Sequence, residues 1–296
     1  MKNLGASPTK RRAALHRPGC SDKYARVARS SSGSSAPSRR PGVVSNMQGC
    51  PHQGWVQVKK LVQGSGSGRG RGSGRGSGRG SRMRFGTWNI GSLTGRSAEV
   101  VEVMRRRKIH IMCLQETKWV GGKAREIAPW GYKLWYSGKD KSRNGVGIII
   151  DKEYIDDVVE VSRKSDRIMS IRLVLGSEAV TIISAYAPQV GLEAFIKQQF
   201  WEDLEEVVQR VPINEKLIIG GDLNGHVGTS RVGFESIHGG FGYGERNEAG
   251  SGILDFALAY GLSIMNTWFE KRESHLVTYR SGSNASQIDL FLVRNA

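Results

Sequence analysis

The chain has 296 residues and a formal net charge of +17 at neutral pH. Its length is enough for one large domain or two small ones. The three cysteines, Cys20, Cys50 and Cys113, are too few and too scattered for a disulfide framework, which favours a reducing compartment. No apolar run approaches the ~18 residues of a membrane span, and the N-terminus lacks the apolar core of a secretory signal. We therefore expect an intracellular protein with a nuclear location.

The basic residues gather in the first part of the chain. Residues 1–82 hold 17 Lys and Arg against the single acid Asp22, whereas residues 83–296 hold 27 Lys and Arg against 26 acids. Within the first part, 64–80 is a Gly/Ser/Arg repeat of the kind that binds nucleic-acid phosphates without reading sequence, or that serves only as a flexible linker. Cys50 and His52 have no second pair of ligands nearby, which argues against a zinc site. We expect 1–82 to be a disordered basic tail.

From residue 83 the composition changes to that of a folded domain, which we place at 83–296. A strand at 83–90 is followed by an amphipathic helix at 97–108, whose basic C-terminal end suits the helix dipole. Helices are also predicted at 192–211 and 249–260. Because strands outnumber helices and several follow one another directly, the pattern favours an α+β layered sandwich over a doubly wound parallel sheet. The other predicted strands are 109–114, 132–136, 146–150, 168–175, 180–185, 216–220, 263–267, 277–279 and 288–293.

Several of these strands end in a polar side chain where the apolar run stops. Asp222 and Asn224 follow the strand 216–220, and because side chains alternate in extended backbone, the two point to the same side. Asp289 lies inside an apolar strand, where a carboxylate costs several kcal/mol unless it is paired or hydrogen-bonded. Taken singly, each such residue is better explained as a turn former, a surface acid or a cap. The full set is Asn89, Glu116, Tyr186, Asp222, Asn224 and Asp289.

As a set, these residues suit phosphoryl transfer assisted by a metal ion. Glu116 offers a hard oxygen to Mg²⁺ or Mn²⁺, with Asn89 as a neutral neighbour, and Asp222 and Asn224 complete the candidate metal-binding set. The metal neutralises charge on the transferring phosphoryl group and on its leaving oxygen. The set therefore predicts a Mg²⁺ or Mn²⁺ cofactor.

The same residues supply the catalytic candidates. Asp222 orients or deprotonates the attacking water, and Asn224 fixes the geometry. Tyr186 donates a hydrogen bond to a non-bridging phosphate oxygen. Asp289 orients a histidine, which needs such a partner to hold its tautomer. The catalytic candidates are thus Tyr186, Asp222, Asn224 and Asp289.

The short sequence motifs around these residues, in their order along the chain, resemble those of the endonuclease/exonuclease/phosphatase superfamily. The run 245–250, together with 266–269 and 278–279, is most similar to the branch that contains craniofacial development protein 2 and the endonuclease domains of non-LTR retrotransposons. The five matching motifs span the whole folded part of the chain. They are Thr87-Trp88-Asn89, Leu114-Gln115-Glu116-Thr117, Ser184-Ala185-Tyr186-Ala187-Pro188, Gly221-Asp222-Leu223-Asn224 and Gln287-Ile288-Asp289.

The resemblance implies a four-layer α/β/β/α sandwich that cleaves phosphodiesters with a metal ion and nicks DNA. It implies that Glu116 is the metal carboxylate and that Tyr186 contacts the phosphate. It also implies that Asp222 and Asn224 position the nucleophile and that Asp289 orients the catalytic histidine.

Two features depart from the family pattern. Gly91 stands where abasic-site endonucleases carry a further aspartate. The family's catalytic histidine lies downstream of the Asp289 strand, on a final strand that closes the sandwich, but this sequence stops at Ala296 and its histidines all precede Asp289. We therefore expect a C-terminally truncated sandwich with weak or no activity, because losing one member of a catalytic set costs orders of magnitude in rate.

Two alternatives stay open. The chain could be a non-catalytic nucleic-acid-binding protein that acts through its basic tail. Phosphatases of inositol lipids or sphingomyelin share the same site residues, so the substrate could also be a small phosphoester. The charge of residues 1–82 favours nucleic acid, most simply DNA, over a small phosphoester.

Overall fold

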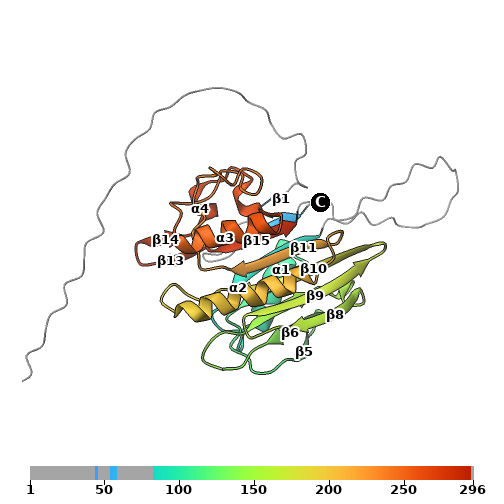
Figure 1. Cartoon of the computed structure of the whole chain (residues 1–296). Coiled ribbons are helices and arrows are strands. Elements are labelled where there is room, and N and C mark those ends of the chain that lie inside the picture. Colours follow the sequence, from blue (N-terminus) through green and yellow to red (C-terminus); the bar gives the residue numbers. More distant parts are fainter. Residues whose placement is uncertain (1–43, 46–53, 59–82, 295–296) are drawn as a thin grey trace, which may run out of the picture. The chain divides into compact units, whose positions relative to one another are not determined.

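A computed structural model describes residues 83–294 and the backbone of two short strands that precede them (Figure 1). These strands are β1 (Val44–Ser45) and β2 (Gly54–Val58). Contacts divide the chain after Arg39, and everything described here belongs to the second unit, which begins at residue 40. The Gly/Ser/Arg repeat, the Cys50 and His52 pair and most of the predicted tail lie outside the described residues.

The first sheet has seven strands in the order β1-β2-β3-β4-β7-β6-β5. Strands β3 and β4 run parallel, whereas all the other neighbouring pairs are antiparallel. Helix α1 (Ser97–Arg107) connects the two parallel strands. The remaining strands are β3 (Arg84–Asn89), β4 (Ile111–Gln115), β5 (Ala124–Ile127), β6 (Tyr132–Ser137) and β7 (Val146–Ile150).

The second sheet has six strands in the order β12-β15-β11-β10-β9-β8. Here β10 and β11 are the parallel pair, and helix α2 (Ala194–Gln209) connects them. The strands are β8 (Val158–Arg163), β9 (Ile168–Leu175), β10 (Glu178–Tyr186), β11 (Lys216–Asp222), β12 (Leu262–Ile264) and β15 (Asp289–Arg294). The other elements are α3 (Glu248–Ala259), α4 (Glu273–Leu276) and the hairpin of β13 (Tyr279–Ser281) with β14 (Asn284–Ser286).

Three apolar clusters separate four layers. One lies between the sheets and contains residues of both, such as Phe85 and Ile182. A second joins the second sheet to helices α2 and α3, and Leu204 and Ile253 are fully buried in it. The third packs α1, through residues such as Met104, against the first sheet. The predicted α/β/β/α sandwich is confirmed.

Helices α1, α2 and α3 match the predicted helices within three residues at each end. The strand predicted at 263–267 is wrong in its second half, because Met265–Thr267 turns into a 3₁₀ helix. The late strand near 277–279 begins only at Tyr279, since Thr278 instead anchors the start of β15. Strands β1, β2, β5, β8 and β14 were not predicted. In the described part of the chain, no helix is both long and apolar enough to span a bilayer.

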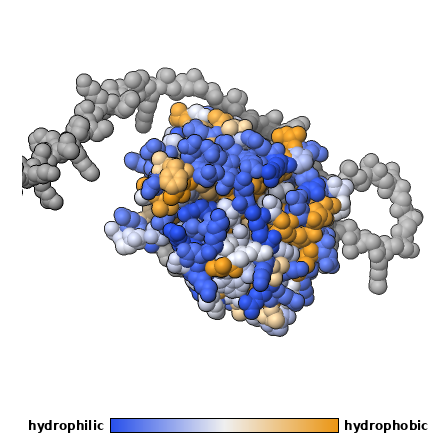
Figure 2. Space-filling view, turned by 60° about the horizontal axis from the view of Figure 1, so that its bottom comes forward, coloured by the Kyte–Doolittle hydropathy of each residue, from blue (hydrophilic) through white to orange (hydrophobic). Residues whose placement is uncertain are grey.

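One face of the described domain is largely hydrophilic, and the hydrophobic residues on it form small separate patches (Figure 2). Among the large apolar side chains exposed on the surface are Val190, Phe195 and Ile213, which lie in or next to α2.

Strand β3 has the burial of an interior strand, because its side chains are buried on both faces. Phe85 and Thr87 lie on one face of the sheet and are 1% and 0% exposed. Trp88 lies on the other face and is also buried. One edge of β3 pairs with β4 and the other with β2, where Gly54 lies opposite Thr87. Strand β2 comes from the part of the sequence that we assigned to the tail, so the domain boundary at 82/83 stays a prediction.

We expect β2 to contribute to the stability of the domain, because without it β3 would present unpaired N–H and C=O groups at an open edge. Removing residues 1–58 should lower the melting temperature by roughly 3–6 °C, equivalent to about 1–2 kcal/mol in a domain of this size. Removing only residues 1–39 is the control and should leave it unchanged. Equal melting temperatures for the two shortened chains, measured by circular dichroism, would show that β2 is dispensable.

Candidate active site

Strands from both sheets bring polar residues to one edge of the sandwich. In the first sheet, β3 and β4 run parallel and pair Asn89 with Gln115, the residue before Glu116. In the second sheet, β10 and β11 run parallel and pair Tyr186 with Asp222. Strand β15 runs antiparallel to β11 and begins at Asp289, directly opposite Asp222. The carboxyl ends of four strands and the start of a fifth therefore meet at the same edge.

The carboxamide of Asn89 bridges the two sheets. Its Nδ2 donates to Glu116 Oε1 and to Asp222 Oδ2, both at 2.9 Å. Its Oδ1 accepts from the backbone N of Gly91 at 3.1 Å. Gly91 has a φ of +67°, a conformation that glycine adopts without strain, so the residue that departs from the family pattern here forms the turn that holds Asn89.

Glu116 is held by a tyrosine and a lysine as well as by Asn89. The Tyr186 hydroxyl donates to Glu116 Oε1 at 2.9 Å, and Lys118 Nζ lies 3.4 Å from Oε2. Burial raises the pKa of the Tyr186 phenol, and the negative charge of Glu116 raises it further. Tyr186 therefore stays protonated near neutral pH and acts as a hydrogen-bond donor. Glu116 itself has a φ of +54°, which turns the chain away at the end of β4.

Asp222 and Asn224 form a tight local unit. The backbone N of Asn224 donates to Asp222 Oδ1 at 3.1 Å, and Asn224 Nδ2 donates to the carbonyl oxygen of Ala187 at 2.8 Å. A Cβ at Gly221 would lie 2.1 Å from the carbonyl oxygen of Ala185, so only glycine allows the two strands to approach this closely ahead of Asp222. Burial raises the pKa of Asp222 to about 6, although hydrogen bonds from Asn89 and Asn224 oppose the shift.

Asp289 is 2% exposed, and its Oδ1 has no hydrogen-bond partner among the described residues. Burial raises the pKa of this carboxyl well above its usual value, and the neighbouring Asp222 adds to the effect. Thr278 and Asn266 fix the strand on either side, because Thr278 Oγ1 accepts from Asp289 N at 3.1 Å and Asn266 Oδ1 accepts from Phe291 N at 2.8 Å. The Asn266 and Thr278 motifs noted in the sequence thus position β15.

None of the four described histidines is hydrogen-bonded to Asp289. His238 is fully buried, and its ring nitrogens contact Gly228 O and Gly240 N in the loop after β11. The backbone N of His226 donates to Asn247 Oδ1 at 3.0 Å. These two histidines have structural roles in the loop that connects β11 to α3.

The oxygen donors at this edge fit a hydrated divalent cation. In the part of the chain that the structure describes, no group of three or more His, Cys, Asp or Glu side chains is arranged to hold a metal ion. Mg²⁺ needs fewer protein ligands, since it keeps several waters and binds through one or two carboxylates. Glu116 is about one-fifth exposed, so water reaches its carboxylate, and the carboxamide of Asn89 is hydrogen-bonded to it through Nδ2.

The sequence did not predict a role for Arg167 or Lys118. Arg167 lies between β8 and β9, and its guanidinium stands over the Tyr186 ring at 5.0 Å from the centroid. Its Nη1 also donates to the carbonyl oxygen of Tyr186 at 3.2 Å. Both cations lie in turns, where no apolar periodicity or strand end marks them.

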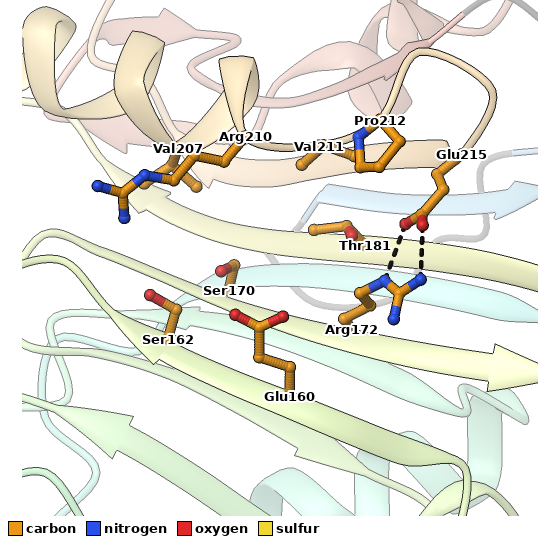
Figure 3. Close-up of a pocket in the computed structure, with 10 residues that line it drawn as sticks. All are labelled: Glu160, Ser162, Ser170, Arg172, Thr181, Val207, Arg210, Val211, Pro212 and Glu215. Carbon is orange, nitrogen blue, oxygen red and sulfur yellow. Dashed lines mark hydrogen bonds and ion pairs between the residues drawn. The ribbon is translucent and has the colours of Figure 1, made fainter.

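A surface pocket lies elsewhere, between the C-terminal end of α2 and strands β8 to β10 (Figure 3). Arg172 and Glu215 face each other across it, and Arg172 Nε donates to Glu215 Oε2 at 2.9 Å. Its lining contains none of the six candidate site residues, and its residue on β10, Thr181, is five positions before Tyr186. The pocket is therefore separate from the candidate active site.

Comparison with protein families identifies the chain. Residues 86–295 match the endonuclease/exonuclease/phosphatase family. The chain belongs to this family. Nucleases of the family generally use a divalent metal ion, which agrees with the oxygen donors at the strand ends. The predicted membership is confirmed.

Among curated proteins, the chain is similar to craniofacial development protein 2 of Bos taurus, with 33% identity over 213 residues. The match covers 71% of this chain and 35% of that protein, so the chain spans about a third of its length. The catalytic domain of Xenopus laevis APE2 has a TM-score of 0.53 and 16% identity, covering 72% of this chain and 82% of that one. The endonuclease domain of the telomere-specific non-LTR retrotransposon TRAS1 has a TM-score of 0.48 and 17% identity, covering 72% and 85%.

The buried carboxylate of Asp289 gives a stability prediction. Because the pKa of Asp289 is higher in the folded than in the unfolded chain, the folded state holds the extra proton between these two pKa values. Its free energy of unfolding should therefore fall as the pH rises above about 4, the usual value for an unfolded aspartate. Asp289→Asn removes the titration and should be more stable than the parent at pH 8 but not at pH 4.

Urea unfolding in EDTA, without added metal, measures this difference. Asp255→Asn, on the exposed side of α3, is the matched control and should follow the parent at both pH values. The quantity compared is the difference in the free energy of unfolding between the parent and Asp289→Asn. The same difference at pH 8 and at pH 4 would contradict the assignment of a destabilising buried charge to Asp289.

Proposed function

We propose that the domain is a phosphodiesterase that depends on a divalent metal ion and nicks DNA. The observation that carries the proposal is the hydrogen-bonded cluster in which Asn89 links Glu116 of the first sheet to Asp222 of the second. Tyr186 completes the cluster through its hydrogen bond to Glu116. Two carboxylates, a carboxamide and a neutral phenol at one strand-end edge provide the donors and acceptors that phosphodiester hydrolysis needs.

Asp222 is the proposed base or orienting group for the attacking water. A general base works best with a pKa close to the operating pH, and burial raises the pKa of Asp222 to about 6. Asn224 fixes the Asp222 carboxylate through its backbone N–H, which leaves the carboxamide oxygen of Asn224 able to accept from the same water. Tyr186, protonated near neutral pH, donates to a non-bridging oxygen of the phosphate.

Glu116 and Asn89 are the proposed ligands of Mg²⁺ or Mn²⁺, with the neighbouring Asp222 and Asn224 as further candidates. When bound, the metal supplies positive charge to the phosphoryl group and its leaving oxygen. Asp289, whose buried Oδ1 has no partner among the described residues, is the proposed acceptor for a donor that completes the site.

DNA is the proposed substrate because the sequence combines this site with 17 basic residues in its first 82. Proteins of similar fold carry names such as AP endonuclease LMAP from Leishmania major and a 3'-5' exonuclease from Neisseria meningitidis, which agrees with the proposal. The resemblance to retrotransposon endonuclease domains further suggests a retroelement origin. We propose a nuclear location for the same reason, because the proposed substrate is DNA.

The second candidate function is nucleic-acid binding without catalysis, through the basic first part of the chain. The observation that favours it is the distribution of charge, since residues 83–296 are nearly neutral while residues 1–82 carry +16. This function needs neither Glu116 nor Asp222.

Nicking of supercoiled plasmid in Mg²⁺ tests the proposal. Asp222→Ala should lower the nicking rate by about 10³-fold or more, because an enzyme loses most of its activity when a single member of a cooperating catalytic set is removed. EDTA should abolish nicking by the parent. The assay is run to long times so that slow nicking is also detected.

Asp255→Ala is the matched control, because it removes an exposed carboxylate of α3 and should nick like the parent. Equal nicking by the parent and by Asp222→Ala would contradict the catalytic role assigned to Asp222. Salt-sensitive DNA binding that is retained in Asp222→Ala and lost on deletion of residues 1–82, without any nicking, would instead support the second function.

A further inference from the structure

Three cations stand on one side of the candidate active site, and we refer to Lys118, Arg143 and Arg167 as the cation lip. Lys118 contacts Glu116, and Arg167 lies over the ring of Tyr186. Burial lowers the pKa of Arg167, and the nearby positive charge of Arg143 acts in the same direction. The three cations lie on loops that are joined to one another by backbone hydrogen bonds.

The loops that carry the cation lip are braced by backbone hydrogen bonds. Lys118 N donates to Asn144 O at 3.0 Å, which ties the segment after β4 to the turn before β7. Gly145 N donates to Asp166 O at 3.0 Å, and Tyr186 N donates to Arg167 O at 2.8 Å. Three turns far apart in the sequence are thus fixed to one another and to the end of β10. The loops that carry the cations are therefore already ordered, so less backbone freedom is lost when they bind a ligand.

Arg167 is the most informative member of the cation lip. Arg167 is partly buried and lies near the carboxylates of Asp166 and Glu116, yet it forms no salt bridge among the described residues. It donates one hydrogen bond to a carbonyl oxygen and rests on an aromatic face. A guanidinium has five N–H donors, and burying it is costly unless they are satisfied. A phosphate oxyanion is the ligand that such a planar fork binds best.

Each cation of the lip has an acid nearby, with Glu116 beside Lys118, Asp140 beside Arg143 and Asp166 near Arg167. Asp140 pairs with the exposed Arg143, whose Nε lies 3.3 Å from Asp140 Oδ2. Asp166 accepts from the carboxamide of Asn144 at 2.9 Å. Exposed pairs of this kind contribute little energy, so a phosphate can replace the Asp140 contact at small cost. Glu116 is already engaged within the candidate active site.

We propose that the cation lip binds a phosphate adjacent to the one that is cleaved, so that the substrate is a polynucleotide strand. This inference rests on the proposed function. An isolated phosphoester, such as a lipid headgroup, would occupy only the site of Glu116, Tyr186 and Asp222. A second anion site beside it serves a substrate with phosphates in a row. Contacts of this kind position the strand without reading its sequence.

The test compares two substrates with the full chain: supercoiled plasmid, and bis(p-nitrophenyl) phosphate, which has a single phosphodiester and no neighbouring phosphate. Arg143→Gln removes an exposed cation without disturbing buried groups. We expect the ratio of plasmid cleavage to bis(p-nitrophenyl) phosphate hydrolysis to fall at least fivefold. Arg167→Lys, which keeps the charge but loses the planar fork, should shift the ratio in the same direction. Arg106→Gln, on the exposed side of α1, is the matched control and should leave the ratio unchanged.

A second readout does not depend on cleavage. Binding of a DNA oligonucleotide is measured in EDTA over a range of salt concentrations. The slope of log affinity against log salt should fall by about 1 in Arg143→Gln and remain unchanged in Arg106→Gln. If Arg143→Gln has the same salt slope and the same cleavage ratio as Arg106→Gln, the proposed role of the cation lip is wrong. Failure of the parent to hydrolyse either substrate would overturn the proposed function, while the salt slope still decides the inference.

Discussion

The candidate site depends on one carboxamide that joins two sheets. Asn89 ends β3 in the first sheet, and its two N–H groups reach Glu116 on one side and Asp222 on the other. An amide nitrogen has two donors and no charge, so it can hold two carboxylates close together without itself changing the charge of the site. A lysine at this position would neutralise the site, and an aspartate would add a third negative charge. The fold brings β3 and β11 face to face, and Asn89 sets the distance between their acids.

The ionised forms of the carboxylates at this edge cost free energy. Burial raises the pKa values of Asp222 and Asp289, and each carboxylate is also opposed by a neighbouring one. Carboxylates that lie close together away from water attract a cation that comes between them, and they also hold their own protons more tightly than they would in water. The physical consequence is a site in which a divalent ion and a proton compete for the same carboxylates. The unsatisfied oxygen of Asp289 fits this picture, because it retains an acceptor that no described residue uses.

The sequence predicted the residues that converge at the strand ends, but not the side chains around them. Asp222 and Asp289 stood out because each interrupts or ends an apolar run, and the parallel and antiparallel registers then place such residues at one edge. Arg167 and Lys118 lie in turns, where neither periodicity nor apolar context separates a site residue from an ordinary surface cation. The pairing of β2 with β3 was also not predicted, because it joins segments separated by a long stretch of sequence and depends on the open edge of β3 rather than on local propensity. The loss of the strand at Met265–Thr267 has a similar cause, since Asn266 leaves the strand to bind β15.

The most direct measurement of the central claim is calorimetric titration of Mn²⁺ into the protein without substrate. If Glu116 and its neighbours form one cation site, the parent should bind Mn²⁺ and Glu116→Gln should bind it at least tenfold more weakly. Glu126→Gln, which changes an exposed acid on β5, should bind like the parent. Equal Mn²⁺ binding by the parent and Glu116→Gln, or no binding by the parent, would contradict the account.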